Sequence, residues 1–188
     1  MPLDVCTGPD SDYKKAVEAL ETTTRWAEQS RERWLYRTKD TDYNGNLFGI
    51  VQGNFYKELR KRSAEEITNL NLPGYAIGGL SVGESYYQFL EFLGYTTELL
   101  PENKPRYIMG IGTPEYILNA VENGVDMFDC VFATRTARNG MVFTRKGPIA
   151  LKKAYNEFVW EPIESGCQCY ACSHYSRAYL RHLFKAKE

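Results

Sequence analysis

Short apolar runs that alternate with helical patterns constrain the fold of this chain most strongly. None of the runs shows the polar/apolar alternation of a half-exposed strand, so we expect both faces of the sheet to be buried. Buried strands joined by amphipathic helices are typical of parallel βα units, because each crossover covers the sheet. The apolar runs are 47–52, 75–80, 106–111 and 125–131, and the helical patterns are 11–34, 56–70, 84–100 and 113–124.

The sequence therefore predicts an α/β fold with a parallel sheet. A doubly wound sheet and a (βα)₈ barrel share this pattern, but no Gly-x-Gly-x-x-Gly motif opens a helix after the first strand. A complete barrel needs about 250 residues, so four strands in 188 residues would form about half of one. Such a half leaves two strand edges unpaired, which reduces its stability.

Several residues are typical of helix ends. Ser63 and Glu66 have the spacing of a capping box. Thr113 is a candidate N-cap with Pro114 at the first helical position, and Gly124 would end that helix.

Composition indicates a globular chain, with 43% hydrophobic and 25% charged residues. The apolar runs are too short to span a bilayer. Residues 135–188 carry ten Lys/Arg and four Asp/Glu, about +6, which leaves about −7 for residues 1–134. This asymmetry favours a polyanionic partner such as nucleic acid. A solvated basic helix face explains it equally well.

The carboxyl ends of the predicted strands carry the candidate site residues, because chemistry gathers at this edge of parallel sheets. Gln52 can bond the edge of a base, and Met109 can lie against an aromatic ring. Gly79 allows its N–H to approach a carbonyl oxygen closely. Each has a structural alternative: a loop amide for Gln52, core packing for Met109 and a tight turn for Gly78-Gly79.

Asp129 ends the last apolar run, and a loop with Arg135 and Arg138 follows it. A carboxylate beside guanidinium groups suits chemistry on a phosphate-bearing substrate. Asp129 would otherwise cap the following turn or pair with Arg135.

Cys167, Cys169 and Cys172 lie within six residues, which favours zinc over a disulfide framework and indicates a reducing compartment, hence the cytoplasm. A structural zinc site needs four ligands. His174 and His182 are present, but neither has the spacing of a natural fourth ligand.

Several motifs together resemble the tRNA-guanine transglycosylases, which introduce queuosine at the wobble position of certain tRNAs. The resemblance covers essentially the whole chain. It rests on the segments 47–53, 74–84, 105–114, 125–140 and 175–180 and on the cysteine cluster. It implies a partial (βα)₈ barrel in residues 1–150, and the start of an inserted zinc subdomain and following helix in 151–188.

By this resemblance Asp129 is the nucleophile that attacks the ribose of the target guanosine and forms a covalent RNA–enzyme intermediate. An incoming 7-deazaguanine then displaces the aspartate, as in a retaining glycosidase. Asp4, followed by Cys6, would recognise the N1 and amino edge of guanine. Gln52 and the Gly79 amide would hold its carbonyl edge, and Met109 would pack on the ring.

The resemblance also indicates the partners. Val82 stands where queuine-using enzymes have glycine, which favours 7-aminomethyl-7-deazaguanine with the Leu80 carbonyl near its amine. Two segments would contact tRNA, and in them Arg135 and Arg138 would meet phosphates. The RNA-contacting residues would be Gly110, Ile111, Gly112, Thr113, Pro114, Glu115, Tyr116, Thr134, Arg135, Thr136, Ala137 and Arg138. Association as a homodimer or with a complementing N-terminal half is expected as well.

The chain departs from the family pattern in three ways. The family's general base lies upstream of these residues, and the histidine that is its fourth zinc ligand would fall about ten residues beyond Glu188. Ala133 occupies a place where proline is expected. We therefore expect the isolated chain to be inactive. Two other classes remain: a non-catalytic tRNA-binding or dimerising subunit of this family, and an unrelated phosphate-binding barrel enzyme.

Overall fold

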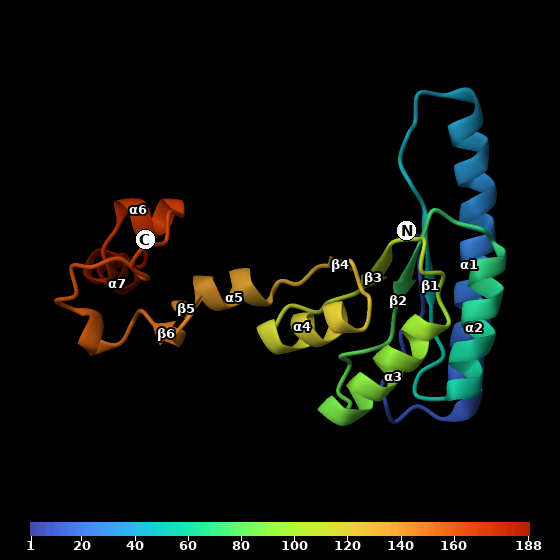
Figure 1. The fold of residues 1–188 in the computed structure, drawn as a ribbon, viewed down its shortest axis with the longest axis horizontal. Helices are drawn as coiled ribbons and strands as arrows, with labels where there is room; N and C mark the ends of the chain where they lie inside the picture. The colour runs from blue at the N-terminus through green and yellow to red at the C-terminus, as the bar shows by residue number, and fades with distance from the viewer. The chain divides into compact units, whose positions relative to one another are not determined.

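The computed structural model describes residues 1–188, with the exception of the side chain of Asp40. The chain divides into two compact units, Met1–Cys130 and Val131–Glu188 (Figure 1). Each unit is described by itself below. The sequence-based division after residue 150 concerns the expected barrel and zinc subdomain, and it stays a prediction.

The first unit is built from successive βα elements around a parallel sheet. Its strands are hydrogen-bonded in the order β1-β2-β3-β4, so each strand pairs with the next along the chain. This confirms the predicted α/β class with a parallel sheet. The elements are α1 (Tyr13–Asp40), β1 (Phe48–Val51), α2 (Lys57–Asn69), β2 (Gly74–Ile77), α3 (Tyr86–Glu98), β3 (Arg106–Ile108), α4 (Pro114–Glu122) and β4 (Met127–Phe128).

The register aligns the carboxyl ends of the four strands. Val51 pairs with Ile77, Ile77 with Ile108, and Ile108 with Phe128. The residues that follow these positions therefore emerge along one edge of the sheet. Gln52, Gly79, Met109 and Asp129 all follow a strand at this edge, as the sequence predicted.

Burial decreases across the sheet. Every residue of β2 is buried, as are three of four in β1, whereas β4 has one exposed and one half-buried residue. The expectation that both faces are buried therefore holds for β1 and β2 and is wrong for β4. The predicted strand 125–131 shortens to two residues, Met127 and Phe128.

The helices follow their predicted ranges with two corrections. α1 continues to Asp40, six residues past the predicted end, and begins after Asp12, whose carboxylate accepts from the Lys15 N–H at 2.8 Å. The capping box at Ser63 and Glu66 is wrong, because Ser63 lies inside α2 and its hydroxyl accepts from the Gln52 N–H. Thr113 and Pro114 begin α4 as predicted.

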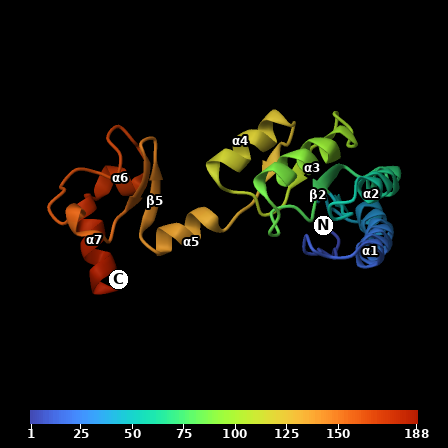
Figure 2. The ribbon, with the colours of Figure 1, turned by 90° about the horizontal axis from the view of Figure 1, so that it is seen from below.

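The core of the first unit lies between the sheet and its helices. Ile67 of α2, Ile77 of β2 and Phe89 of α3 are essentially inaccessible to solvent. α1 and α2 run side by side (Figures 1 and 2) and enclose a smaller cluster of Ala16, Leu20 and Leu59. α2 is thus held on both sides and forms a fixed support beneath the carboxyl end of β1.

The second unit is small and buries few apolar side chains. It contains α5 (Phe132–Arg138), the antiparallel hairpin β5 (Met141–Thr144) and β6 (Gly147–Ala150), the 3₁₀ helix η1 (Ala154–Asn156), α6 (Tyr170–His174) and α7 (Arg177–Ala186). The loop predicted to carry Arg135 and Arg138 is therefore a helix. The Arg177 guanidinium donates to the carbonyls of Pro162 and Ile163, which ties the intervening loop to α7.

No helix in the described part of the chain combines the length and the apolar character needed to cross a bilayer.

Candidate active site

Asp129 follows β4 and is held by two donors on a single oxygen. The Tyr107 hydroxyl, from β3, donates to Oδ1 at 2.5 Å, and the Gly110 N–H donates to the same atom at 2.9 Å. The Gly110 turn has φ +74°, with no atom within 4 Å of a would-be Cβ. Neighbouring strand ends therefore orient one exposed carboxylate.

These contacts also control ionisation. The hydrogen bond from Tyr107, followed by that from Gly110, lowers the pKa of Asp129. Burial, followed by the contact with Asp129, raises the pKa of Tyr107 to about 12. At neutral pH the pair is a carboxylate beside a neutral phenol, which suits a nucleophile.

Asp4 and Gln52 meet at the carboxyl end of β1. Gln52 Nε2 donates to Asp4 Oδ2 at 2.6 Å, although the residues are 48 positions apart. The Gln52 N–H is fixed by Ser63 Oγ at 3.0 Å, and the Asp4 segment is tied to α1 by the Val5 N–H on Thr23 Oγ1. Two side chains with base-edge hydrogen-bonding capacity thus form one cluster.

The Gly78-Gly79 turn closes against this cluster. A Cβ on Gly78 would lie 2.6 Å from Gln52 Nε2, and one on Gly79 would lie 2.6 Å from Gln52 Oε1. Gly79 also has φ +67°, which disfavours other residues. Both glycines are therefore required by close approach to the Gln52 amide, beyond what an ordinary tight turn demands.

Cys6 lies beside the same turn. Partial burial, and next the charge of Asp4, raises the pKa of its thiol, while the Gly79 N–H acts in the opposite direction. Cys6 is therefore a neutral thiol at physiological pH.

The loop after Leu80 is clamped by a carboxylate. Glu84 accepts from the Ser81 N–H at 2.5 Å through Oε1 and from the Val82 N–H at 2.8 Å through Oε2. This clamp fixes the segment that contains the Leu80 carbonyl.

The predicted RNA-contacting residues fall into both units. In the first, Gly110 is exposed, whereas Ile111 is only 2% exposed and Tyr116 packs on Phe89 at 4.5 Å between ring centroids. In the second, Arg135 and Arg138 are exposed on α5. Contact with RNA stays a prediction for every one of them.

The cysteine cluster is brought together in the second unit. The sulfur atoms of Cys167, Cys169 and Cys172 all lie within 4.8 Å of one another. Zinc with Zn–S bonds of about 2.3 Å holds tetrahedral sulfurs about 3.8 Å apart, so the three thiols fit one zinc ion. Hydrogen bonds from the Cys172 main chain, and then from the Cys167 side chain, lower the pKa of Cys169. A lowered pKa favours the thiolate that a metal requires, whereas burial raises the pKa of Cys172.

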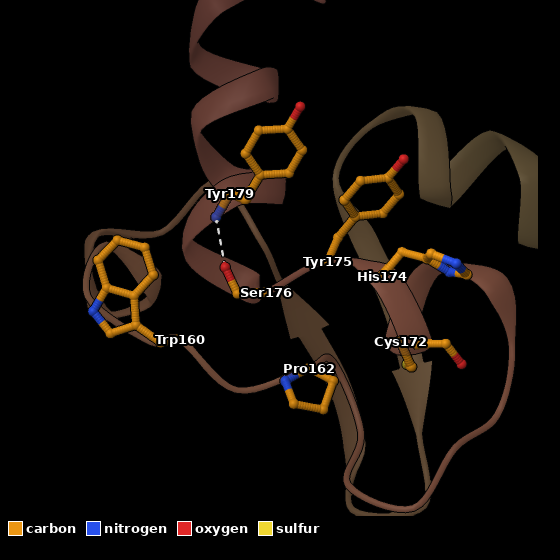
Figure 3. A pocket seen from close by; sticks show the side chains of 8 residues that line it. Trp160, Pro162, Cys172, His174, Tyr175, Ser176 and Tyr179 are labelled. Atoms are coloured by element: carbon orange, nitrogen blue, oxygen red, sulfur yellow. Dashed lines mark hydrogen bonds between the residues drawn. The ribbon is translucent and has the colours of Figure 1, made fainter.

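The two histidines are not part of this cluster of described ligand atoms. His174 Nδ1 lies 2.9 Å from the Tyr170 carbonyl. A pocket of about 570 Å³ beside the cluster is lined by aromatic residues, including Trp160 and Tyr179 (Figure 3). Tyr175 and Tyr179 stack there with their centroids 5.3 Å apart.

Three residues of the site escaped sequence reasoning: Tyr107, Arg60 and Glu84. Tyr107 resembles any strand aromatic. Arg60 falls among charged residues in α2, although its spacing from Ala64 and Ile67 places it on the apolar face. Glu84 lies at the end of the segment 74–84, which carries part of the resemblance. Nothing in the sequence indicated that its carboxylate binds main-chain N–H groups.

Known proteins match this sequence over its whole length. The family model described as queuine tRNA-ribosyltransferase matches residues 1–188. Proteins named queuine tRNA-ribosyltransferase are 49% identical in Natranaerobius thermophilus, 48% in Caldanaerobacter subterraneus subsp. tengcongensis and 49% in Borrelia duttonii. Each alignment covers all 188 residues of this chain and 49–50% of the relative.

The chain thus spans about half the length of these curated relatives. The family match and the aligned regions span residues 1–188 and so include the positions of the site described above. On these grounds the chain belongs to the queuine tRNA-ribosyltransferase family.

Proposed function

We propose that this chain is the Asp129-bearing half of a tRNA-guanine transglycosylase. The observation that carries the proposal is the Asp129 carboxylate, which is held on Oδ1 by Tyr107 and Gly110 at the edge of a parallel sheet. Because both donors act on Oδ1, we assign attack to Oδ2. The complete enzyme would exchange guanine at the wobble position of tRNA for 7-aminomethyl-7-deazaguanine, in queuosine biosynthesis.

The exchange proceeds by two displacements. Asp129 attacks C1′ of the ribose, the C1′–N9 bond breaks, and its electron pair leaves with guanine. The expelled guanine takes up a proton at N9. N9 of the incoming 7-deazaguanine then loses its proton to the general base of the missing half and attacks C1′, and the bond between C1′ and the Asp129 oxygen breaks, so the configuration is retained. The target base must leave the stack, which costs little in a single-stranded anticodon loop.

Base recognition would fall to the cluster at β1 and β2. Asp4 would accept from N1–H and the amino group, while Gln52 and the Gly79 N–H would donate to the carbonyl oxygen. Support comes from the 2.6 Å contact that joins Asp4 to Gln52 and from the close approach of Gly79 to the Gln52 amide. Met109 would cover one face of the ring.

Zinc would be held by Cys167, Cys169 and Cys172 and would fix the fold of the second unit rather than take part in the exchange. The fourth ligand would come from residues beyond the described cluster. Support comes from the proximity of the three sulfurs and the lowered pKa of Cys169.

The isolated chain should be inactive. Loss of a general base costs about 10²–10⁴ in rate. Further support comes from β4, which has one exposed and one half-buried residue and would leave one wall of the site open. A complementing half, or a second copy of the chain, would be needed to close it.

The alternative is a non-catalytic tRNA-binding or dimerising subunit of the same family. The basic residues of α5 and α7 favour this reading, since they would bind RNA without chemistry. The retained cluster of Asp4, Gln52 and Asp129 favours the enzyme.

The decisive experiment is a denaturing gel with an anticodon stem-loop and 9-deazaguanine, with and without an added N-terminal half. We expect a covalent band only when both halves are present, and none with Asp129→Asn. A band that survives Asp129→Asn would refute the nucleophile assignment. Binding of the stem-loop without a band in any combination would establish the subunit instead.

A further inference from the structure

Arg60 is a fully buried cation whose described hydrogen bonds all end on main-chain carbonyls. Its Nε donates to the Asn54 carbonyl at 2.8 Å, its Nη1 to Gly78 at 2.7 Å and its Nη2 to Gly79 at 3.1 Å. The side chain has no solvent exposure, and burial lowers its pKa to about 10. The described ion pairs of the chain do not include Arg60. Burial of a charged arginine without an ion-pair partner costs free energy. We therefore expect the role of Arg60 to require the planar set of N–H donors that a guanidinium provides.

The peptide between Gly78 and Gly79 is the group that this fork controls. In a trans peptide the C=O and the N–H point in opposite directions. Because the Gly78 carbonyl points at Arg60, the Gly79 N–H points away from it. On that side the N–H interacts with the Cys6 sulfur, and the Gln52 amide lies beside Gly79. The N–H therefore faces the cluster of Asp4, Cys6 and Gln52.

Glycine on both sides makes the orientation of this peptide easy to lose. A peptide plane rotates through opposite changes in ψ of the first residue and φ of the second, and glycine tolerates the resulting angles. The planar guanidinium of Arg60 binds the Gly78 and Gly79 carbonyls together. The peptide between these residues therefore cannot rotate unless these hydrogen bonds break. The two glycines permit the close approach to Gln52. Because they also permit rotation of the peptide between them, another group must hold this peptide in place.

We propose that Arg60 is a positioning residue for base recognition: by binding the Gly78 and Gly79 carbonyls it aims the Gly79 N–H at the substrate's carbonyl oxygen. Arg60 does not touch the base. This inference rests on the proposed function for the identity of the base, while the orientation of the peptide is independent of it.

The test compares guanine with 2-aminopurine, which lacks both the carbonyl oxygen and the N1–H; of these two groups only the oxygen would face the Gly79 N–H. The full 188-residue chain, 15N-labelled and mixed with the added N-terminal half, is titrated with 2-aminopurine, followed by fluorescence; guanine is measured by displacement. In the wild type we expect guanine to bind more tightly and to shift the Gly79 amide resonance. In Arg60→Met the guanine preference should fall about fivefold, the loss of one neutral hydrogen bond, while 2-aminopurine affinity changes little.

Two further variants separate positioning from general support. Arg60→Lys retains a donor without the fork, so its preference should lie between those of wild type and Arg60→Met. It also serves where Arg60→Met fails to fold. Lys61→Met, next to Arg60 but on the exposed face of α2, should retain the wild-type preference and the wild-type melting temperature.

The outcomes are distinguishable. A folded Arg60→Met or Arg60→Lys that keeps the full guanine preference would overturn the positioning role. Equal loss of affinity for guanine and 2-aminopurine would show that Arg60 supports the fold and does not position the Gly79 N–H. A wild-type chain that does not distinguish the bases, or that leaves the Gly79 amide unshifted, would overturn base recognition itself before any substitution is considered.

Discussion

A carboxylate that accepts two hydrogen bonds on one oxygen is both oriented and kept ionised. In Asp129 the phenol of Tyr107 and the amide of Gly110 supply these bonds. The same contacts leave a phenol whose pKa is raised to about 12, so the proton stays on Tyr107 throughout the neutral range. The proposed chemistry therefore depends on the pair formed by Asp129 and Tyr107.

Tyr107→Phe should raise the pKa of Asp129, because the largest influence that lowers it is removed. A lowered pKa keeps the Asp129 carboxylate ionised down to lower pH. Removal of the Tyr107 hydroxyl therefore moves the titration of Asp129 to higher pH. Carbon-13 NMR of labelled aspartate against pH measures it, with Tyr87→Phe, on an exposed tyrosine, as the control. An unchanged titration would show that Tyr107 does not act on Asp129.

Gly79→Ala tests the close approach at the turn. Both Gly79 and Gly110 have positive φ, +67° and +74°, so alanine should cost about 1–2 kcal/mol of backbone strain at either. A Cβ at 79 would also overlap Gln52 Oε1 at 2.6 Å, whereas one at 110 meets nothing within 4 Å. Urea unfolding should therefore show a larger loss for Gly79→Ala than for Gly110→Ala. Equal losses would mean that Gln52 moves aside freely.

Helix α2 is the element that organises the site. It supplies Arg60 to the turn after β2 and Ser63 to the main chain of Gln52 after β1. Its opposite face carries the exposed pair Lys61–Glu65 at 3.9 Å. One helix thus supports two strand ends with its buried side and contributes little through its surface charges.

Ser63→Ala should destabilise the first unit by about 1–3 kcal/mol, because the buried N–H of Gln52 would lose its acceptor. Glu65→Ala, on the exposed face, should change the free energy of unfolding by less than about 0.5 kcal/mol. Chemical denaturation followed by circular dichroism measures both. The support role of α2 fails if the two substitutions prove equivalent.

At the scale of the whole molecule the chain divides into two units with different sources of stability. The first encloses a core of strands and helices, whereas residues 131–188 bury few large apolar side chains. A small unit with so little core usually needs a metal or another staple. The cluster of three cysteines is the candidate.

Chelation of zinc should therefore unfold residues 157–186 and leave the first unit intact. We expect close to one zinc per chain, which Cys169→Ser lowers and Cys6→Ser, outside the cluster, does not. Metal analysis and peptide-resolved hydrogen exchange would show this. If chelation left protection in α7 unchanged, zinc would have no part in holding the unit together.

The sequence was sufficient for the placement of Gln52, Gly79, Met109 and Asp129. Each follows an apolar run, and parallel strands bring such positions to one edge without further information. It was insufficient for Tyr107 and Arg60, whose partners are 22 and 18 residues away. Tyr107 reaches Asp129 through the register of the sheet, and Arg60 reaches Gly78 through the packing of α2 against it. Ser63 was misread for the same reason, since its partner is on another element.

Local periodicity was thus enough to define the α/β order and the strand ends that carry the candidate site residues, and the longer motifs carried the resemblance to the family. Only the tertiary structure decided which of those side chains are restrained, and by what. The physical reason is that a hydrogen bond between distant elements depends on their packing, and packing has no period in the sequence. Arg60 is buried and donates to four main-chain carbonyls, but in the sequence it is one of several charged residues of a helix.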